Sequence, residues 1–154
     1  MLKKIFLIIA IIFISGCGYQ AMHSKSKLTD TDFSITEIEF KGDRDINIKI
    51  DEKLKSYTKI IKKKTYVLLI KNTYQKETIA RDKKGDPTIF EITVSGFVKV
   101  MDKKKIKAKI PFAKRFKYNN DKSRFEQKRH EKEIKEALAE TISNDIIIKI
   151  SNIK

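Results

Sequence analysis

Hydrophobic residues change their spacing along this 154-residue chain, and each spacing predicts one kind of element. Over residues 33–40 apolar and polar positions alternate with one change of parity, which predicts a strand with a bulge. Over residues 46–57 apolar residues recur every three or four positions behind the possible N-caps Asp43 and Asp45, which predicts an amphipathic helix. The apolar run at residues 65–70 is too short for a surface helix and predicts a buried strand.

Two longer segments, residues 90–100 and 106–118, carry apolar side chains at their even-numbered positions. They flank the turn-like Met101-Asp102-Lys103 and predict a β-hairpin with one face in the core. Pro111 has no N–H group, which predicts an edge strand or a bulge at that point. On its other face the second strand is expected to carry a one-sided basic row, formed by Lys105, Lys107, Lys109, Arg115 and Lys117.

The last segment predicts a long helix that begins behind a capping box formed by Ser123 and Glu126. Its apolar stripe keeps a step of four and consists of Ile134, Leu138, Ile142, Ile146 and Ile150. The element order is therefore strand, helix, strand, hairpin, helix. It predicts an α+β fold, a two-layer sandwich in which two helices pack on one face of a four-stranded mixed sheet. At least part of the other face is left to solvent or a partner.

The first eighteen residues follow the order of a bacterial lipoprotein signal. Lys3 and Lys4 precede an apolar run at residues 5–14, which is shorter than the roughly 20 residues that span a bilayer. The tetrapeptide Ile14-Ser15-Gly16-Cys17 resembles the lipobox of such signals. An ordinary secretory leader with a chance cysteine, or a short membrane anchor, are the alternatives. We expect a signal peptide at 1–16, a lipidated tether at 17–32 and one domain at 33–154.

Cys17 is the lipid-attachment site in this interpretation, and it is the only cysteine of the chain. Its acyl chains would hold the protein on a membrane without crossing it. Gly18 follows the cysteine. In bacteria that follow the well-known lipoprotein sorting rule, an aspartate at this position retains the protein in the inner membrane. We therefore expect the outer membrane, with the domain on its periplasmic side.

The net charge is strongly positive. Removing Lys3 and Lys4 from the 35 basic residues leaves 33 against 20 acidic ones, hence +13 for the mature chain. Such a field favours an anionic partner. An exported lipoprotein meets phosphorylated lipids, acidic polysaccharide and other proteins rather than nucleic acid. Part of the charge can instead reflect the Lys- and Ile-rich composition that an AT-rich genome produces.

Catalytic and metal-binding patterns are weak in this sequence. His23 lies in the tether and His130 on a highly charged helix, and neither has a second ligand at metal-binding spacing. No nucleophile pairs with a base, and no phosphate-cradling glycine loop occurs. We therefore expect no enzyme, no catalytic residue, no metal and no cofactor.

Four features together resemble the lipopolysaccharide-assembly lipoprotein family LptE. They are Cys17-Gly18-Tyr19 after the lipobox, the element order, the glycine turn at 81–87 before the hairpin, and the closing helix KEALAETISNDIIIKI at 135–150. The resemblance implies a small protein that sits as a plug inside the outer-membrane barrel LptD and helps lipopolysaccharide reach the cell surface. The chain departs from the family in Gln20-Ala21-Met22, where a basic residue is common, and in Lys83-Lys84, which lengthen the turn.

The resemblance also implies where lipopolysaccharide is contacted. Family members place basic residues in the turn before the hairpin, which Arg81 matches, and near the start of the last helix, which Lys128 matches approximately. Together with Lys105, Lys107 and Lys109 these are the candidate ligand-binding residues, since Arg and Lys bind lipid phosphates by charge-assisted hydrogen bonds. Solvated surface charge is the alternative for each. A lipoprotein that binds acidic polysaccharide or inhibits a secreted hydrolase is the alternative function.

Overall fold

A computed structural model describes residues 31–59, 61–103, 105–120 and 123–153. The predicted signal peptide, Cys17, His23 and residues 17–30 of the predicted tether lie outside these residues. Within the described ranges, no helix is both long enough and apolar enough to cross a membrane.

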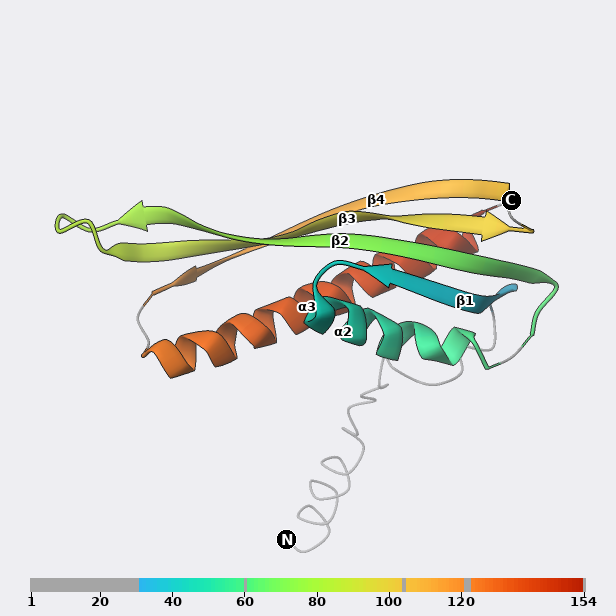
Figure 1. Ribbon diagram of the computed structural model, residues 1–154, viewed down its shortest axis with the longest axis horizontal. Helices are drawn as coiled ribbons and strands as arrows, with labels where there is room; N and C mark the ends of the chain where they lie inside the picture. The colour runs from blue at the N-terminus through green and yellow to red at the C-terminus, as the bar shows by residue number, and fades with distance from the viewer. Residues whose placement is uncertain (1–30, 60, 104, 121–122, 154) are drawn as a thin grey trace, which may run out of the picture.

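The sheet has four strands in the order β1-β2-β3-β4 (Figure 1). Their bounds are Phe33–Lys41 for β1, Lys64–Arg81 for β2, Pro87–Asp102 for β3 and Lys105–Asn119 for β4. β1 runs parallel to β2, and the other two pairs are antiparallel, so the sheet is mixed. The expected bulge in β1 is confirmed by a register shift between Ile35 and Glu37. Pro111 lies in β4, which is an edge strand, as its missing donor requires.

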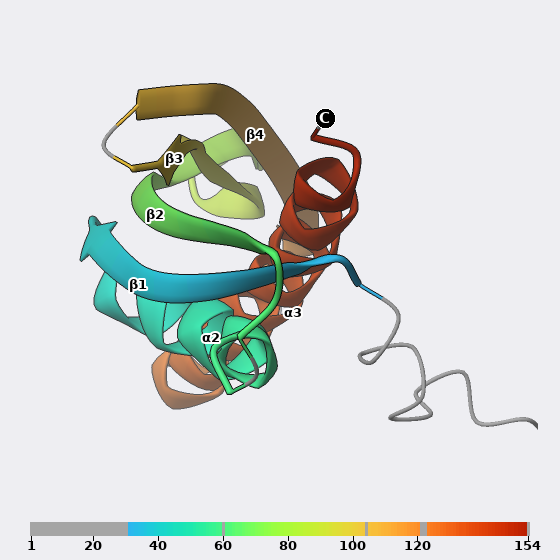
Figure 2. The same cartoon turned by 90° about the vertical axis from the view of Figure 1, so that its right-hand side faces the viewer.

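Helices α2 (Arg44–Leu54) and α3 (Arg124–Ser151) lie on the same side of the sheet (Figure 2). A short 3₁₀ segment, η2 (Lys55–Tyr57), follows α2. This arrangement confirms the predicted two-layer α+β architecture. Asp43 caps α2 by accepting the backbone N–H groups of Asp45 and Ile46, and Ser123 caps α3 by accepting that of Glu126.

The core lies between the sheet and the helices. Ile46, Ile50 and Leu54 of α2 are fully buried against it, and every member of the α3 stripe from Ile134 to Ile150 is buried. From the sheet the inward-facing residues are the alternate positions of the central strands, namely Leu68, Ile70, Ile92, Val94, Val98 and Val100. Burial of this continuous apolar set is the main force that holds the two layers together.

The strand predicted at 65–70 extends to Arg81 in the structure. Its second half projects beyond α2 and pairs with the first half of β3, as the left-hand part of Figure 1 shows. The sheet therefore has two distinct ends. The turn end holds the β2–β3 connection at residues 82–86, and the opposite end holds the starts of β1 and β2 and the β3–β4 turn.

Two residues expected in the core are exposed. Ile106 is 61% exposed because a register shift between Val100 and Met101 pairs it with Met101, on the face away from the helices. Phe116 pairs with the buried Ile92 and so points to the helix side, but it is 45% exposed because the edge strand has a neighbour on one side only.

Candidate functional site

The sheet face that points away from α2 and α3 is the candidate site, and no described element covers it (Figure 1). We call it the outer face. On β4 it carries the exposed side chains of Lys109, Arg115 and Lys117, which occupy alternate positions as the sequence pattern predicts. Lys117 pairs with Glu91 of β3 at 3.8 Å. Basic charge is therefore displayed along the length of this edge strand.

The predicted one-sided row of lysines is wrong at its beginning. In the strand register, Lys109 lies opposite Lys99. Beyond the register shift, Lys105 lies opposite Asp102. Because an extra residue in a strand reverses the parity of those beyond it, Lys105 shares the face of Asp102 and not that of Lys109. Lys107 occupies the shift itself, and its Nζ lies 3.8 Å from Asp102 Oδ2.

On the part of the outer face nearer the β3–β4 turn, lysines surround one aromatic ring. We call Lys71, Phe97, Lys99 and Lys109 the Phe97 patch. Lys71 and Phe97 are register partners on β2 and β3, and Lys99 and Lys109 are partners on β3 and β4. The Nζ of Lys109 lies 4.5 Å from the centre of the Phe97 ring, and that of Lys99 lies 5.8 Å from it. The electron-rich ring face attracts both ammonium groups.

The Phe97 patch has an excess of positive charge. Among the described residues, none of its three lysines forms an ion pair. Glu39 lies in the same cross-strand row as Lys99, but it is two strands away, roughly 10 Å. It is bound instead to Lys41 at 3.1 Å. Like charges directly opposite on neighbouring strands repel each other, so an anionic ligand would relieve a standing repulsion here.

Arg81 lies at the turn end and folds back over its own turn. Its Nη1 donates to the carbonyl oxygen of Gly85 at 2.8 Å. Asp82 Oδ1 accepts the backbone N–H groups of Lys84 and Asp86, and Gly85 adopts a φ of 90° that favours glycine. Arg81 therefore helps to hold the turn, and its remaining guanidinium donors are free to contact a ligand from this exposed position.

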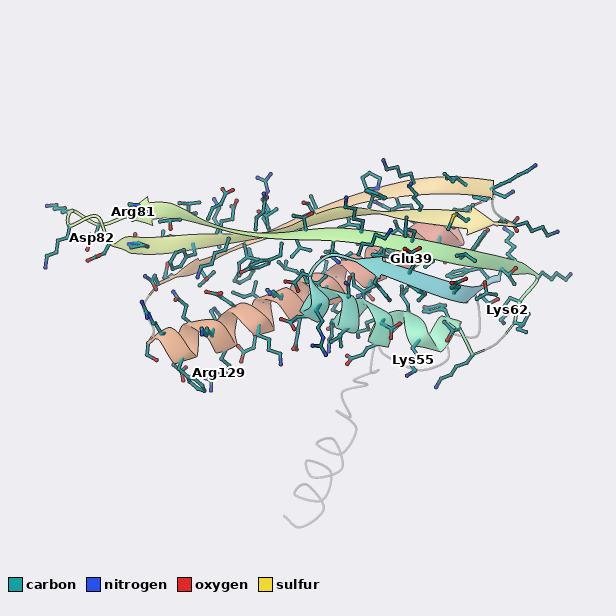
Figure 3. All side chains as sticks on the ribbon, in the orientation of Figure 1. Glu39, Lys55, Lys62, Arg81, Asp82 and Arg129 are labelled. Carbon is teal, nitrogen blue, oxygen red and sulfur yellow. The ribbon has the colours of Figure 1, made fainter. Side chains whose placement is uncertain are left out.

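Lys128 lies at the same end of the molecule as Arg81. Asn120 donates from Nδ2 to the carbonyl oxygen of Pro87, and Gln127, next to Lys128, donates to Asn120. These bonds tie the start of α3 to the start of β3. Figure 3 shows Arg81 and Arg129 at one end and Lys62 at the other.

The five candidate ligand residues therefore fall into two groups. Arg81 and Lys128 lie at the turn end, while Lys105, Lys107 and Lys109 lie toward the end of the β3–β4 turn. The 16 residues of β3 separate the two ends by roughly 50 Å. One phosphate group cannot contact both.

Between α3 and the projecting part of the sheet lies a cluster of polar and aromatic side chains. Tyr118 Oη donates to Glu131 Oε1 at 2.9 Å, and Glu131 also pairs with Lys76. Burial, together with the hydrogen bond to Glu131, raises the pKa of Tyr118. His130 packs edge-on against Tyr118 with ring centres 5.5 Å apart. No group of side chains suited to hold a metal ion occurs among the described residues.

The sequence pattern identified Lys109 but not the rest of the Phe97 patch. Lys71 lies in β2 just beyond the strand that the pattern predicted at 65–70. Phe97 and Lys99 occupy odd-numbered positions of β3, whereas the apolar pattern marks the even-numbered positions. The spacing of Phe97 and Lys99 by two residues was the available signal, because it places both on one face.

The comparisons with known proteins reveal the fold. No family model and no curated protein matches the sequence. Rare lipoprotein B from Shewanella oneidensis has a similar structure, with a TM-score of 0.58 at 11% identity, over 75% of this chain and 93% of that one. A putative lipoprotein from Caulobacter crescentus has a TM-score of 0.55 at 15% identity, over 82% and 94%. A minor lipoprotein from Acinetobacter baumannii has 0.52 at 13%, over 74% and 92%. These bacterial lipoproteins share the fold of this chain.

Proposed function

We propose that this chain is a lipid-anchored outer-membrane protein that binds lipopolysaccharide and assembles with a large β-barrel of the LptD kind. In this role it would help lipopolysaccharide reach the cell surface. The pattern that ends in Cys17 supports the anchor, and so do the names of the three structures described above, each of which is a lipoprotein. The resemblance to the LptE family supports the partner and the ligand.

The outer face is the observation on which the proposal rests. No described residue outside the sheet covers this face, and it carries the Phe97 patch. A solvated sheet face is ordinary in antiparallel proteins. An ordinary solvated face, however, mixes charges of both signs, whereas Lys99 and Lys109 lie opposite each other without a carboxylate. An anionic ligand would therefore bind here without displacing an ion pair of either lysine.

Lipopolysaccharide suits this surface in its chemistry. Lysine ammonium groups bind phosphates as mobile point charges, and an aromatic ring such as that of Phe97 offers an apolar face beside them. We place the phosphate contacts at Lys109 and its partner Lys99. Arg81 and Lys128 form a second contact region at the turn end, which an extended ligand reaches separately.

The barrel partner is proposed from the amount of uncovered sheet. β1 and β4 are both edge strands, and the face between them is open. Unpaired edges and an uncovered face favour association with another chain. A partner that surrounds the domain would cover the face and both edges together.

Co-purification tests the proposal. The full chain is extracted from its own outer membrane in a mild non-ionic detergent and recovered through an affinity tag at its C-terminus. A stoichiometric complex with one large β-barrel protein, which the chain protects from protease, is the expected result. Recovery of a free monomer would contradict the proposal and favour the alternative role in binding acidic polysaccharide.

A further inference from the structure

A cavity of about 220 Å³ opens at the end of the sheet opposite Arg81. Its walls come from three segments, namely the residues that lead into β2, the start of β2 itself, and the β3–β4 turn with the first part of β4. Four lysines line it, Lys63, Lys64, Lys103 and Lys107, together with Asp102 and the largely buried ring of Tyr66. The four lysines and one aspartate of the lining carry a net charge of +3.

Two of these lysines are already fixed by neighbours. Lys64 Nζ donates to the carbonyl oxygen of Ile153 at 3.1 Å, just beyond the end of α3. Lys107 pairs with Asp102 at 3.8 Å. A carbonyl is neutral, so Lys64 keeps its full charge for a ligand. No described residue forms an ion pair with Lys63 or Lys103, and the one carboxylate of the lining, that of Asp102, is engaged with Lys107.

Lys103 is an unusual residue for its backbone position. It has a φ of 45° and lies in a two-residue hairpin connection, where glycine, asparagine or aspartate is favoured. A lysine here strains the turn and contributes a charge to the cavity. The turn itself would be formed more easily by asparagine.

The position of the cavity relates it to the membrane. β1 begins at Phe33, which is the register partner of Lys64, so the chain that leads to the predicted anchor joins the domain at this end. The 16 residues of the predicted tether, 17–32, span at most roughly 50 Å. The cavity can therefore reach the surface of the membrane that holds the anchor.

We propose that this cavity is a separate anion site that binds a single phosphate group. Lys63 and Lys103 would donate to the phosphate oxygens, while Lys64 and Lys107 add positive charge from their fixed positions. The phosphate comes either from a phospholipid headgroup or from free phosphate in solution. The site requires neither lipopolysaccharide nor a barrel partner, so it stands or falls independently of the function proposed above.

The test follows backbone amide NMR signals of the full chain in dodecyl maltoside during a titration with inorganic phosphate, with chloride at matched ionic strength as reference. Saturable shifts at Lys63, Lys64 and Lys103 are expected with phosphate only. In Lys63→Gln/Lys103→Asn the affinity should fall about tenfold. Lys55→Gln/Lys59→Gln is the matched control, because it removes the same charge from exposed positions outside the cavity and should leave the affinity within about twofold.

A second arm identifies the source of the phosphate. The same signals are recorded in nanodiscs of equal parts phosphatidylglycerol and phosphatidylcholine, and in nanodiscs of phosphatidylcholine alone. If the signals shift in the anionic nanodiscs and free phosphate then causes no further shift, the ligand is a phospholipid headgroup. Shifts with free phosphate alone assign it to the soluble ion. No saturable shift in either arm, or equal losses in the cavity variant and the control, would overturn the proposal. Lys103→Asn should melt no lower than the natural chain, which separates loss of binding from unfolding.

Discussion

Lys135 Nζ lies 2.9 Å from Asp43 Oδ2, although 92 residues separate the two in the chain. Both side chains are largely buried, at 16% and 19% exposure. Asp43 also caps α2, and its backbone N–H donates to Asn72 of β2 at 2.9 Å. One carboxylate thus connects α2 to α3, while its own residue is bonded to the sheet. This junction lies at the N-terminus of α2, next to the part of the sheet that projects beyond that helix.

Removal of the Asp43 carboxylate should destabilise the fold. Asp43→Ala loses the cap and leaves Lys135 without its closest partner, and we expect a cost of about 2 kcal/mol in the free energy of unfolding. Asp43→Asn keeps a capping side chain and should cost about half as much. Urea unfolding measures both. Asp45→Ala is the control, because Asp45 is 48% exposed and lies 3.6 Å from Lys135, so it should change stability by no more than about 0.5 kcal/mol. If Asp45→Ala lowered the free energy of unfolding as much as Asp43→Ala, the stabilising role given to the Asp43 carboxylate would be wrong.

The same junction makes stability depend on pH. Burial alone would raise the pKa of Asp43, but hydrogen bonds from Lys135, Ile46 and Asp45 outweigh it and hold that pKa below the ordinary value of 3.8. The ionised carboxylate therefore stabilises the fold above pH 3.8, and this contribution disappears as the pH falls through the lower folded pKa. Between pH 7 and pH 3, Asp43→Asn should lose less stability than the natural chain. Parallel losses in the two proteins would show that Asp43 plays no part.

Gly96 should tolerate no side chain. A Cβ there would lie 1.9 Å from the carbonyl oxygen of Lys71 on the neighbouring strand, so the backbone itself must move. We expect Gly96→Ala to lower the free energy of unfolding by about 3 kcal/mol. Gly85→Ala is the comparison, since a Cβ there meets open space and only the φ of 90° opposes it, at about 1 kcal/mol. Thermal melting measures both variants, and Gly96→Ala should have the lower melting temperature.

Lipid attachment at Cys17 remains a prediction, because that residue lies outside the described part of the chain. Cys17→Ala should abolish acylation and leave the precursor uncleaved by the lipoprotein peptidase. Mass spectrometry of the N-terminus of the natural protein is the direct measurement. An unmodified cysteine, or a mature chain that begins at another residue, would refute this interpretation.

The sequence pattern predicted the elements that bury apolar stripes and missed the one that does not. The second half of β2 faces inward with Asn72, Tyr74 and Lys76. Asn72 bonds to Asn47, Tyr74 lies under Lys135 and Lys76 pairs with Glu131. Because these inward positions contact polar groups on the helices, no alternation of apolar and polar residues marks the strand. The second half of β2 forms a strand because of partners that only the tertiary structure brings to it.

The candidate site was predicted in part for a related reason. Alternation places Lys109, Arg115 and Lys117 on one face from sequence alone, but a bulge shifts Lys105 to the other. The bulge leaves no trace in the pattern, since Ile106 is apolar on either face. The Phe97 patch is assembled from three strands, and its register cannot be derived from any one of them.

The affinity for purified lipopolysaccharide, measured at one fixed salt concentration, distinguishes a binding surface on the outer face from a general positive field. Lys99→Gln/Lys109→Gln removes two charges from the Phe97 patch, Arg81→Gln/Lys128→Gln removes two from the turn end, and Lys55→Gln/Lys59→Gln removes two from exposed positions away from both. Circular dichroism confirms the fold of each. We expect an affinity about tenfold weaker for the first two variants and a change within about twofold for the third. Equal losses in all three would show that lipopolysaccharide responds only to the overall positive field, and would contradict a binding surface on the outer face.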